Sequence, residues 1–596
     1  MISNALRKLT PYLAIGLIVC TYLWATAVVL GRKTSEAPSA KTVIRFAHHQ
    51  LETGVREAID ALADDYTRLH PNVQIVQEAV PDGTYGQWLT TQLIGGDPPD
   101  IMQLEAVAFL PWHVWMSFIE RYFVHITAHV NEPNPYNVGT VLEGVPLRKT
   151  FKDGMRVTFS THTIEYWGMA LTRFCGRVFY NKTLLAELTG RSEPPNNWRE
   201  FAEVCSRIAA QEDESGKAYI PIANSKAHMP MWEAGVADPL TYPLLKFADF
   251  NRDGGLHPQE VWVAVKSGRM SLNHPALRAR FQILREIAKF SQPGYTGLNR
   301  DEAVFLFIQQ RAVFITGGTY EAYSLLDMAE GHFKIDVMPY PRVDKDDPDY
   351  GQFVYGPVSE ESLAATLAGL QMGITTASDH PDQALDFLMY LASQKGNERL
   401  TQRIGWLPII KGAETDAFLK KFEPNVEGIT GFVGTGNLIM GGDTNIKYMQ
   451  MYPLYQLGEI SLDEFLSEYE SFYIEQGGLD FEEQLLQFTE NSKRSQEFLV
   501  AIRSRARAAA DPEEAQSQWG RYWQLLWQSQ ILVEIVSEQL EDMIQKGPIL
   551  EANLPYEYTE GALARVRQRI RQELEHKQAG GGTLVAQPAA TGTAGG

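Results

Sequence analysis

Residues 249–260 carry oxygen-bearing side chains at the spacing of an EF-hand calcium loop. Positions 1, 3 and 5 offer side-chain oxygens, a glycine at position 6 allows the sharp turn, and position 12 offers a bidentate carboxylate. The predicted Ca²⁺ ligands are Asp249, Asn251, Asp253, Gly255 through its carbonyl, and Glu260. The alternative is an acidic, glycine-rich surface turn without an ion. Only one such loop occurs, whereas calcium sensors use pairs, so we expect a structural ion.

A helix stop followed by a buried strand marks a second candidate site. Gly95 and Gly96 end a predicted helix at 85–94, and Pro98 and Pro99 prevent it from resuming. The strand begins at Ile101. The loop after a parallel strand is where open α/β sheets bind ligands. Its residues are Gln103, Leu104 and Glu105. Asp97 and Asp100, which precede the strand, are expected to be structural turn residues.

The elements that position these residues alternate between strand and helix. Predicted strands cover 43–47, 73–77, 101–102, 177–180, 311–316 and 370–374. Predicted helices cover 55–70, 85–94, 277–290, 301–310 and 381–393, and capping-box patterns at Asn197 and Ser461 begin two more. Gly317 and Gly318 end one strand and would let a ligand approach the backbone. The order predicts the α/β class with a parallel sheet.

The two ends of the chain differ from this pattern. Residues 11–31 are uncharged and long enough to span a bilayer, so we predict an N-terminal transmembrane helix, with residues 1–42 forming the anchor and a linker. A cleaved signal peptide is the alternative. Residues 413–577 are predicted to form a mostly helical extension, and residues 578–596 a disordered tail.

Composition excludes some functions. The chain has 596 residues and a net charge of −20, which argues against nucleic acid as a partner. Cys175 and Cys205 are the only cysteines beyond the predicted anchor, too few for a disulfide scaffold, although one bridge is possible. Two separately buried thiols are the favoured interpretation.

Five pieces of the sequence, in this order, resemble the extracellular solute-binding proteins of ABC importers, the large family that includes maltose-binding protein. They are residues 91–101, 179–185, 197–201, 312–320 and 381–391. The resemblance covers residues 43–412 and implies a two-lobe periplasmic-binding-protein type II fold with ligand bound between the lobes. We expect lobe 1 to comprise residues 43–165 and 316–380, and lobe 2 to comprise residues 175–310 and 381–412.

The resemblance also implies a set of ligand contacts. Tyr320 occupies the place of an aromatic residue that stacks on sugar rings, beside Gly318. The remaining implied contacts are His49, Gln50, Glu105, Arg173, Met231, Trp232 and Trp406. Aromatic faces with a few polar groups suit carbohydrate. Gln103 and Leu104 depart from the pattern of maltose binders, so the sugar is not expected to be a maltodextrin.

These observations predict a monomeric, membrane-tethered, extracytoplasmic protein that captures a carbohydrate and delivers it to an ABC permease without changing it. One alternative is a sensor ectodomain of the same fold. Another is an exported glycan-active enzyme, because a catalytic carboxylate pair would not stand out among 73 acidic residues. The sequence contains no zinc-protease, nucleophile-elbow or phosphate-loop motif, which disfavours the enzyme.

Overall fold

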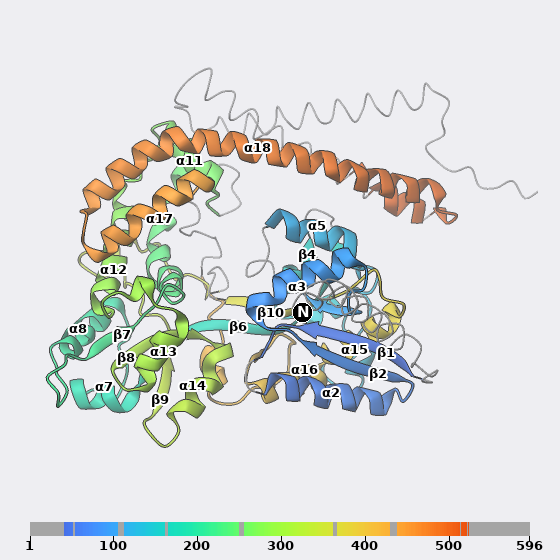
Figure 1. The fold of residues 1–596 in the computed structure, drawn as a ribbon, viewed down its shortest axis with the longest axis horizontal. Helices are drawn as coiled ribbons and strands as arrows, with labels where there is room; N and C mark the ends of the chain where they lie inside the picture. Colours follow the sequence, from blue (N-terminus) through green and yellow to red (C-terminus); the bar gives the residue numbers. More distant parts are fainter. Residues whose placement is uncertain are drawn as a thin grey trace, which may run out of the picture.

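The computed structural model comprises two α/β lobes that share one long strand. It describes residues 41–523 apart from 52–53, 105–111, 161–164, 250–254, 361–365, 429–437, 513 and 521. Strand β6 (Gly168–Asn181) pairs with β10 through its first half and with β8 and β9 through its second half. Figure 1 shows β6 crossing from one lobe to the other. The lobe containing the first half of β6 is called lobe 1, and the other is called lobe 2.

The lobe 1 sheet has the strand order β2, β1, β3, β10, β6. Strand β1 (Thr42–His48) is parallel to β2 (Val73–Ala79) and to β3 (Ile101–Gln103), whereas β10 (Thr366–Ile374) is antiparallel to β3 and β6. The main helices of this lobe are α2 (Val55–Leu69), α3 (Asp82–Gly95), α5 (Trp112–Tyr122), α15 (Pro381–Leu391) and α16 (Gln394–Ile404).

Asp100 fixes the turn between α3 and β3. Its carboxylate accepts hydrogen bonds from the backbone N–H of Arg45 at 2.8 Å and from the hydroxyl of Ser378 at 2.5 Å. Gly96 ends α3 in the left-handed conformation, with φ 78°. The carboxylate therefore joins β1 and the residue before β3 to the turn that follows β10, and the expectation of a structural role for Asp100 is confirmed.

Lobe 2 is built around the second half of β6. Strands β8 (Ala312–Gly318) and β9 (Ile335–Met338) pair antiparallel with β6, and β7 (Ile220–Ala223) lies parallel to β8. Asn197 caps α8 (Trp198–Ala209), as predicted, because its side-chain oxygen accepts from the backbone N–H of Glu200 at 2.9 Å. The other helices of this lobe are α7 (Lys182–Thr189), α9 (Met229–Trp232), α10 (Leu245–Ala248), α11 (Pro258–Lys266), α12 (Pro275–Phe290), α13 (Arg300–Ile308) and α14 (Ala322–Ala329).

Two segments belong to different lobes from those expected. Residues 316–338 were assigned to lobe 1, but β8 and β9 pair with the lobe 2 half of β6. Residues 381–410 were assigned to lobe 2, but α15, α16 and β11 (Leu407–Pro408) pack against or pair with lobe 1. Strand pairing and helix packing decide these assignments, and the local sequence pattern does not reveal either one.

The helical extension packs on lobe 2. Helix α17 (Gly442–Leu457) and the 47-residue α18 (Leu462–Ala508) form a hairpin that contributes to the same apolar core as α11 and α12. Ser461 caps α18 through a hydrogen bond from the backbone N–H of Glu464 at 3.1 Å, as its sequence predicts. Figure 1 shows α18 (orange) running far beyond the rest of lobe 2.

No helix among residues 41–523, where described, is long and apolar enough to cross a membrane. The predicted transmembrane helix at 11–31, the end of the extension after residue 523 and the tail at 578–596 all lie outside the described residues.

Candidate interlobe binding site

The lobe 1 side of the candidate site lies where β1 and β3 end. The backbone N–H of His49 donates to the side-chain oxygen of Gln103 at 3.2 Å, and Tyr85 donates its hydroxyl proton to the Gln103 carbonyl at 2.8 Å. Gln50 Nε2 lies 3.2 Å from His49 Nε2, and Asp82 lies 3.3 Å from the other ring nitrogen. The structure therefore brings the predicted contacts His49 and Gln50 together with Gln103.

His48 supports this edge from inside the sheet. Its Nε2 lies 2.6 Å from Gln77 Oε1, and its Nδ1 accepts a hydrogen bond from the backbone N–H of Gln50 at 3.1 Å. Burial lowers the pKa of His48 below its ordinary value. The neutral ring, protonated on Nε2, fits both contacts and fixes the backbone that leads into Gln50.

The middle of β6 and the end of β8 meet at a pair of glycines. Gly176 lies opposite Gly318. A Cβ on Gly318 would lie 2.2 Å from the ring of Tyr320, and one on Gly176 would lie 2.6 Å from the hydroxyl of Tyr340 and 3.3 Å from the methyl of Met231. These glycines therefore make room for side chains of the chain itself, where the sequence suggested room for a ligand.

Tyr320 lies between the two lobes. It belongs to the short 3-10 helix η6 (Thr319–Glu321) of lobe 2 and packs against the apolar core of lobe 1. Its ring is perpendicular to that of Phe174, with centroids 5.8 Å apart, and the Arg300 guanidinium lies 4.6 Å from its centroid. Among the predicted aromatic contacts, Tyr320 is therefore the one placed at the lobe junction.

Two predicted tryptophan contacts are core residues. Trp232 is 0% exposed, with its ring 5.4 Å from that of Phe201 and 6.1 Å from that of Tyr340. Trp406 is 6% exposed and belongs to the core of lobe 1, although the resemblance implied that it came from lobe 2. Burial of both side chains does not support the ligand contacts predicted for them.

The other predicted contacts are distributed along the junction. Arg173 is buried on the lobe 1 half of β6, opposite Ala368 and Leu407. Met231 is half-buried beside Gly176. Glu105 lies outside the described residues.

A buried histidine near the junction was missed. His228 follows β7, and its Nδ1 lies 2.7 Å from the hydroxyl oxygen of Ser225. Burial, together with the positive charge of Arg300, lowers the pKa of His228 to about 4, so the ring is neutral at pH 7. The sequence does contain a pattern that points to this position: the polar pair Asn224 and Ser225 directly follows a short apolar strand. The same pattern identified Gln103 as a candidate.

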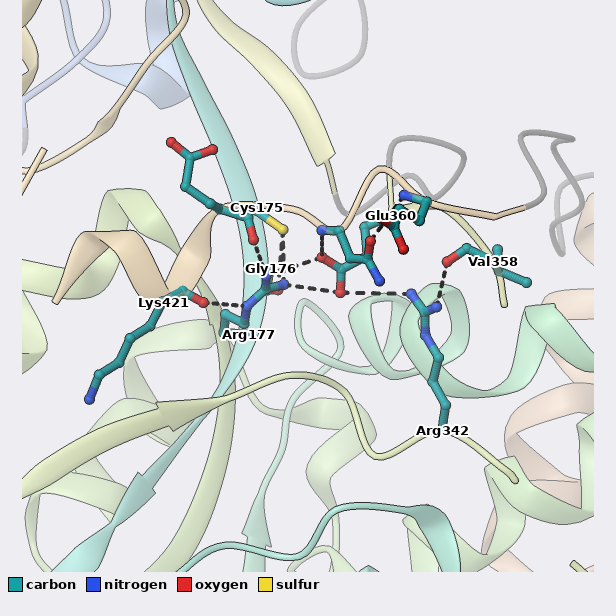
Figure 2. A network of polar contacts seen from close by, with 10 residues as sticks. Cys175, Gly176, Arg177, Arg342, Val358, Glu360 and Lys421 are labelled. Atoms are coloured by element: carbon teal, nitrogen blue, oxygen red, sulfur yellow. Dashed lines mark hydrogen bonds and ion pairs between the residues drawn. The ribbon is translucent and has the colours of Figure 1, made fainter. Parts of the chain in front are cut away.

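Arg177 is the centre of a buried polar network where β6 passes between the lobes (Figure 2). Its terminal nitrogens donate to the two carboxylate oxygens of Glu360 at 3.3 and 3.1 Å. The guanidinium also donates to the carbonyls of Gly176, Lys421 and Glu423, each at 2.9 Å. One side chain therefore joins β6 to two segments that are far from it in sequence.

Glu360 completes this network. Its carboxylate accepts from the backbone N–H of Asn425 at 2.8 Å, and its own N–H donates to the Asn425 carbonyl at 2.8 Å. Arg342 lies 3.8 Å from the carboxylate and donates to the Val358 carbonyl at 2.6 Å. We call Arg177, Arg342, Glu360 and Asn425 the hinge network, because they join β6 to the two later segments that lead between the lobes.

The predicted calcium loop is described only at its ends. The predicted ligands fall into two groups: Asn251 and Asp253 lie outside the described residues, and Asp249, Gly255 and Glu260 lie within them. The Glu260 carboxylate accepts from the backbone N–H of His257 at 3.1 Å and closes a capping box at the start of α11. In the part of the chain that is described, no three His, Cys, Asp or Glu residues form a metal-binding group. Calcium binding remains a prediction.

Comparison with known proteins places this geometry in a family. The family model for the bacterial extracellular solute-binding protein matches residues 52–398. A structure reported with xylan utilization by Caldanaerobius polysaccharolyticus is 16% identical, with coverage of 72% of this chain and 99% of that chain and a TM-score of 0.50. The apo form of RafE from Streptococcus pneumoniae is also 16% identical, with coverage of 74% and 100% and a TM-score of 0.50.

RafE in complex with raffinose is 16% identical, with coverage of 73% of this chain and 100% of that chain and a TM-score of 0.48. At these identities, the similarity to the structures with a TM-score of 0.50 shows a shared fold. The family model spans more than half of the sequence. The chain therefore belongs to the bacterial extracellular solute-binding protein family.

Proposed function

We propose that this protein binds a carbohydrate between its two lobes, outside the cytoplasm, and delivers it to an ABC permease. The N-terminal segment at 11–31 would tether it to the membrane, because that segment is uncharged and long enough to span the bilayer. Binding leaves the sugar chemically unchanged.

The observation that carries the proposal is the arrangement of polar and aromatic groups around the lobe junction. Hydrogen-bonding side chains, His49, Gln50 and Gln103, lie at one strand edge of lobe 1. An aromatic ring, Tyr320, lies at the junction on the lobe 2 side. Sugars present hydroxyls around apolar ring faces, and a site with both kinds of group satisfies both parts of such a ligand.

Membership of the solute-binding family supports capture of a solute, and the shared fold with a protein reported in connection with xylan utilization supports a carbohydrate as that solute. The hinge network supports a two-lobe mechanism. The segments that pass from one lobe to the other make buried contacts with each other near Arg177. The lobes can rotate about this point without unfolding either sheet.

The test is a thermal-shift panel on the full-length protein with xylo-oligosaccharides, raffinose, other oligosaccharides, amino acids and short peptides. A binder is stabilised by its ligand in proportion to RT ln(1 + [L]/Kd), so a true ligand raises Tm with concentration. Mass spectrometry of the recovered sugar should show no product. A response to peptides alone would refute the carbohydrate assignment, and product formation would indicate an enzyme.

Two matched variants then locate the site. Tyr320→Ala should weaken binding about 10-fold or more, because an aromatic stacking contact is lost. Tyr219→Ala is the control, since Tyr219 is also a half-buried tyrosine of lobe 2 beside an arginine, at the start of β7. Equal effects of the two changes would exclude a specific role for Tyr320.

A further inference from the structure

Arg300 occupies a position on the Tyr320 ring where a stacking ligand would be expected. Its guanidinium carbon lies 4.6 Å from the ring centroid, within the range of a cation–π contact. Arg300 is the first residue of α13, and Tyr320 follows β8, so the contact joins two separate elements of lobe 2.

Glu321 fixes Arg300 in this position. Arg300 Nε donates to Glu321 Oε1 at 2.6 Å, and the other carboxylate oxygen accepts from the backbone N–H of Gly318 at 3.3 Å. The Glu321 side chain is only 13% exposed, whereas that of Arg300 is 40% exposed. The arginine is therefore held by a nearly buried partner while part of it reaches solvent.

The rest of the Tyr320 ring is contacted by the chain as well. The ring lies so close to Gly318 that a Cβ there would come within 2.2 Å of it, and Phe174 packs perpendicular to it. Gly318 is backbone at a strand end and Phe174 belongs to β6, so neither can move without disturbing the sheet. Of these three contacts, Arg300 is the one that can move away by a change of side-chain rotamer and loss of its ion pair with Glu321, because it is a long side chain that is 40% exposed.

We propose that Arg300 is a specificity-determining residue that covers the Tyr320 ring, and that a sugar which stacks on this ring must displace the guanidinium. The identity of the ligand rests on the proposed function, whereas the contact of Arg300 with the Tyr320 ring does not depend on it. Guanidinium and pyranose both use the face of an aromatic ring, so they compete for it.

The chain contains a matched pair for comparison. Arg311 lies 5.5 Å from the ring centroid of Tyr219 and forms an ion pair with Asp213. Tyr219 and Arg311 precede the paired starts of β7 and β8, whereas Tyr320 follows the end of β8. Arg311→Ala therefore uncovers a tyrosine on the same lobe but at the opposite end of the strands.

The first experiment tests, without any ligand, whether Arg300 shields the Tyr320 ring from solvent. Folded wild type, Arg300→Ala and Arg311→Ala are iodinated under limiting conditions, and modification of each tyrosine is followed by peptide mass spectrometry. Arg300→Ala should raise the rate at Tyr320 at least about three-fold and leave Tyr219 unchanged, and Arg311→Ala should do the reverse. An unchanged rate at Tyr320 in Arg300→Ala overturns the proposal.

The second experiment measures Kd for the carbohydrate found in the thermal-shift panel. Arg300→Ala should tighten binding about two- to five-fold, the range expected when one partly exposed cation–π contact no longer competes. Arg311→Ala should leave Kd unchanged. Weaker or unaltered binding by Arg300→Ala overturns the proposal, because it makes Arg300 a ligand contact or a bystander. If wild type binds no carbohydrate, the proposed function fails and the iodination result alone decides whether Arg300 is a cover.

Discussion

The hinge network and the junction between lobe 2 and α17 are each centred on a buried arginine, but their charges are balanced in opposite ways. At the hinge, Arg177 and Arg342 approach one carboxylate, that of Glu360. At the α17 junction, Arg280 faces two carboxylates, Glu233 at 3.1 Å and Asp238 at 2.8 Å.

The remaining partners differ as well. Arg177 donates to three backbone carbonyls, and one of its terminal nitrogens also donates to the Cys175 sulfur at 3.0 Å. Glu233 accepts a hydrogen bond from the hydroxyl of Tyr452 on α17 at 2.9 Å, so the extension is attached through a carboxylate that Arg280 also contacts. Burial, together with the negative charge of Glu233, raises the pKa of Asp238 to about 6 against the opposing effect of Arg280. The stability of the extension junction should therefore depend on pH, because Asp238 takes up a proton near pH 6.

The largest effect is expected from Arg280→Met. Removal of the guanidinium that pairs with both Glu233 and Asp238 would leave two buried carboxylates close together, and loss of one partner of a buried ion pair typically costs about 3–5 kcal/mol. Urea unfolding at pH 7.5 measures the loss, which should shrink at pH 5 because Asp238, with its pKa of about 6, then takes up a proton. Arg285→Met, on the same helix and beside the Tyr455 ring, should lose less than about 1 kcal/mol.

Glu360→Gln should have a somewhat smaller effect. The amide keeps the shape of the side chain but removes the only acidic partner among the hinge residues named, and a hydrogen bond to a charged group contributes about 1.5–3 kcal/mol. Urea unfolding at pH 7.5 measures the loss in free energy of unfolding. Glu423→Gln, which affects a half-exposed pair with Lys152, should change stability by no more than about 1 kcal/mol. A loss for Glu360→Gln no larger than that for Glu423→Gln would refute the central place of Glu360 in the hinge network.

Asp238→Asn tests whether the stability of the extension junction depends on pH. The folded-state pKa of Asp238 is raised above its unfolded value of about 3.9, so the folded state binds more protons between about pH 4 and 6. This group therefore favours folding at low pH, and its contribution falls by about 2 kcal/mol as pH rises through that window. The low pKa of His228 has the opposite sign, so the quantity to measure is the difference in slope between Asp238→Asn and wild type. Identical slopes would contradict the assignment.

Calcium gives the smallest expected effect. If the loop at 249–260 binds the ion, Ca²⁺ at ten times Kd should stabilise the folded protein by about 1.4 kcal/mol. This loop leads from α10 into α11, and α11 contacts α18. Bound calcium would therefore stabilise the part of lobe 2 that holds the extension. Calorimetry with Asp253→Ala as the control measures the binding, and heat changes that are absent or equal in both proteins would refute it.

Local signals in the sequence predicted most elements of the fold. The helix stop before β3 and the caps at Asn197 and Ser461 are set by residues within a few positions of one another, and all three appear in the structure. The alternation of strand and helix was likewise sufficient for the α/β class. These features depend on short-range backbone geometry, which a single sequence displays directly.

The features that were missed depend on long-range packing. Arg177 and Glu360 are 183 positions apart, and neither lies in a motif that indicates the other. Trp232 was predicted as a ligand contact from its type and neighbourhood, but whether a ring faces a ligand or the core depends on elements such as α8 and the segment at Tyr340. The assignment of β8 and α15 to their lobes failed for the same reason, since pairing partners are chosen in three dimensions.

Helix α18 has a geometric consequence for any movement of the lobes. Its 47 residues make it about 70 Å long, and its contacts with α11, α12 and α17 fix its first part to lobe 2. A rod held at one end converts a small turn at its base into a large displacement at its tip. A 10° rotation of lobe 2 relative to lobe 1 would carry the far end of α18 through an arc of about 12 Å. Any change in the angle between the lobes would therefore produce its largest displacement at the far end of the extension, distant from the ligand site.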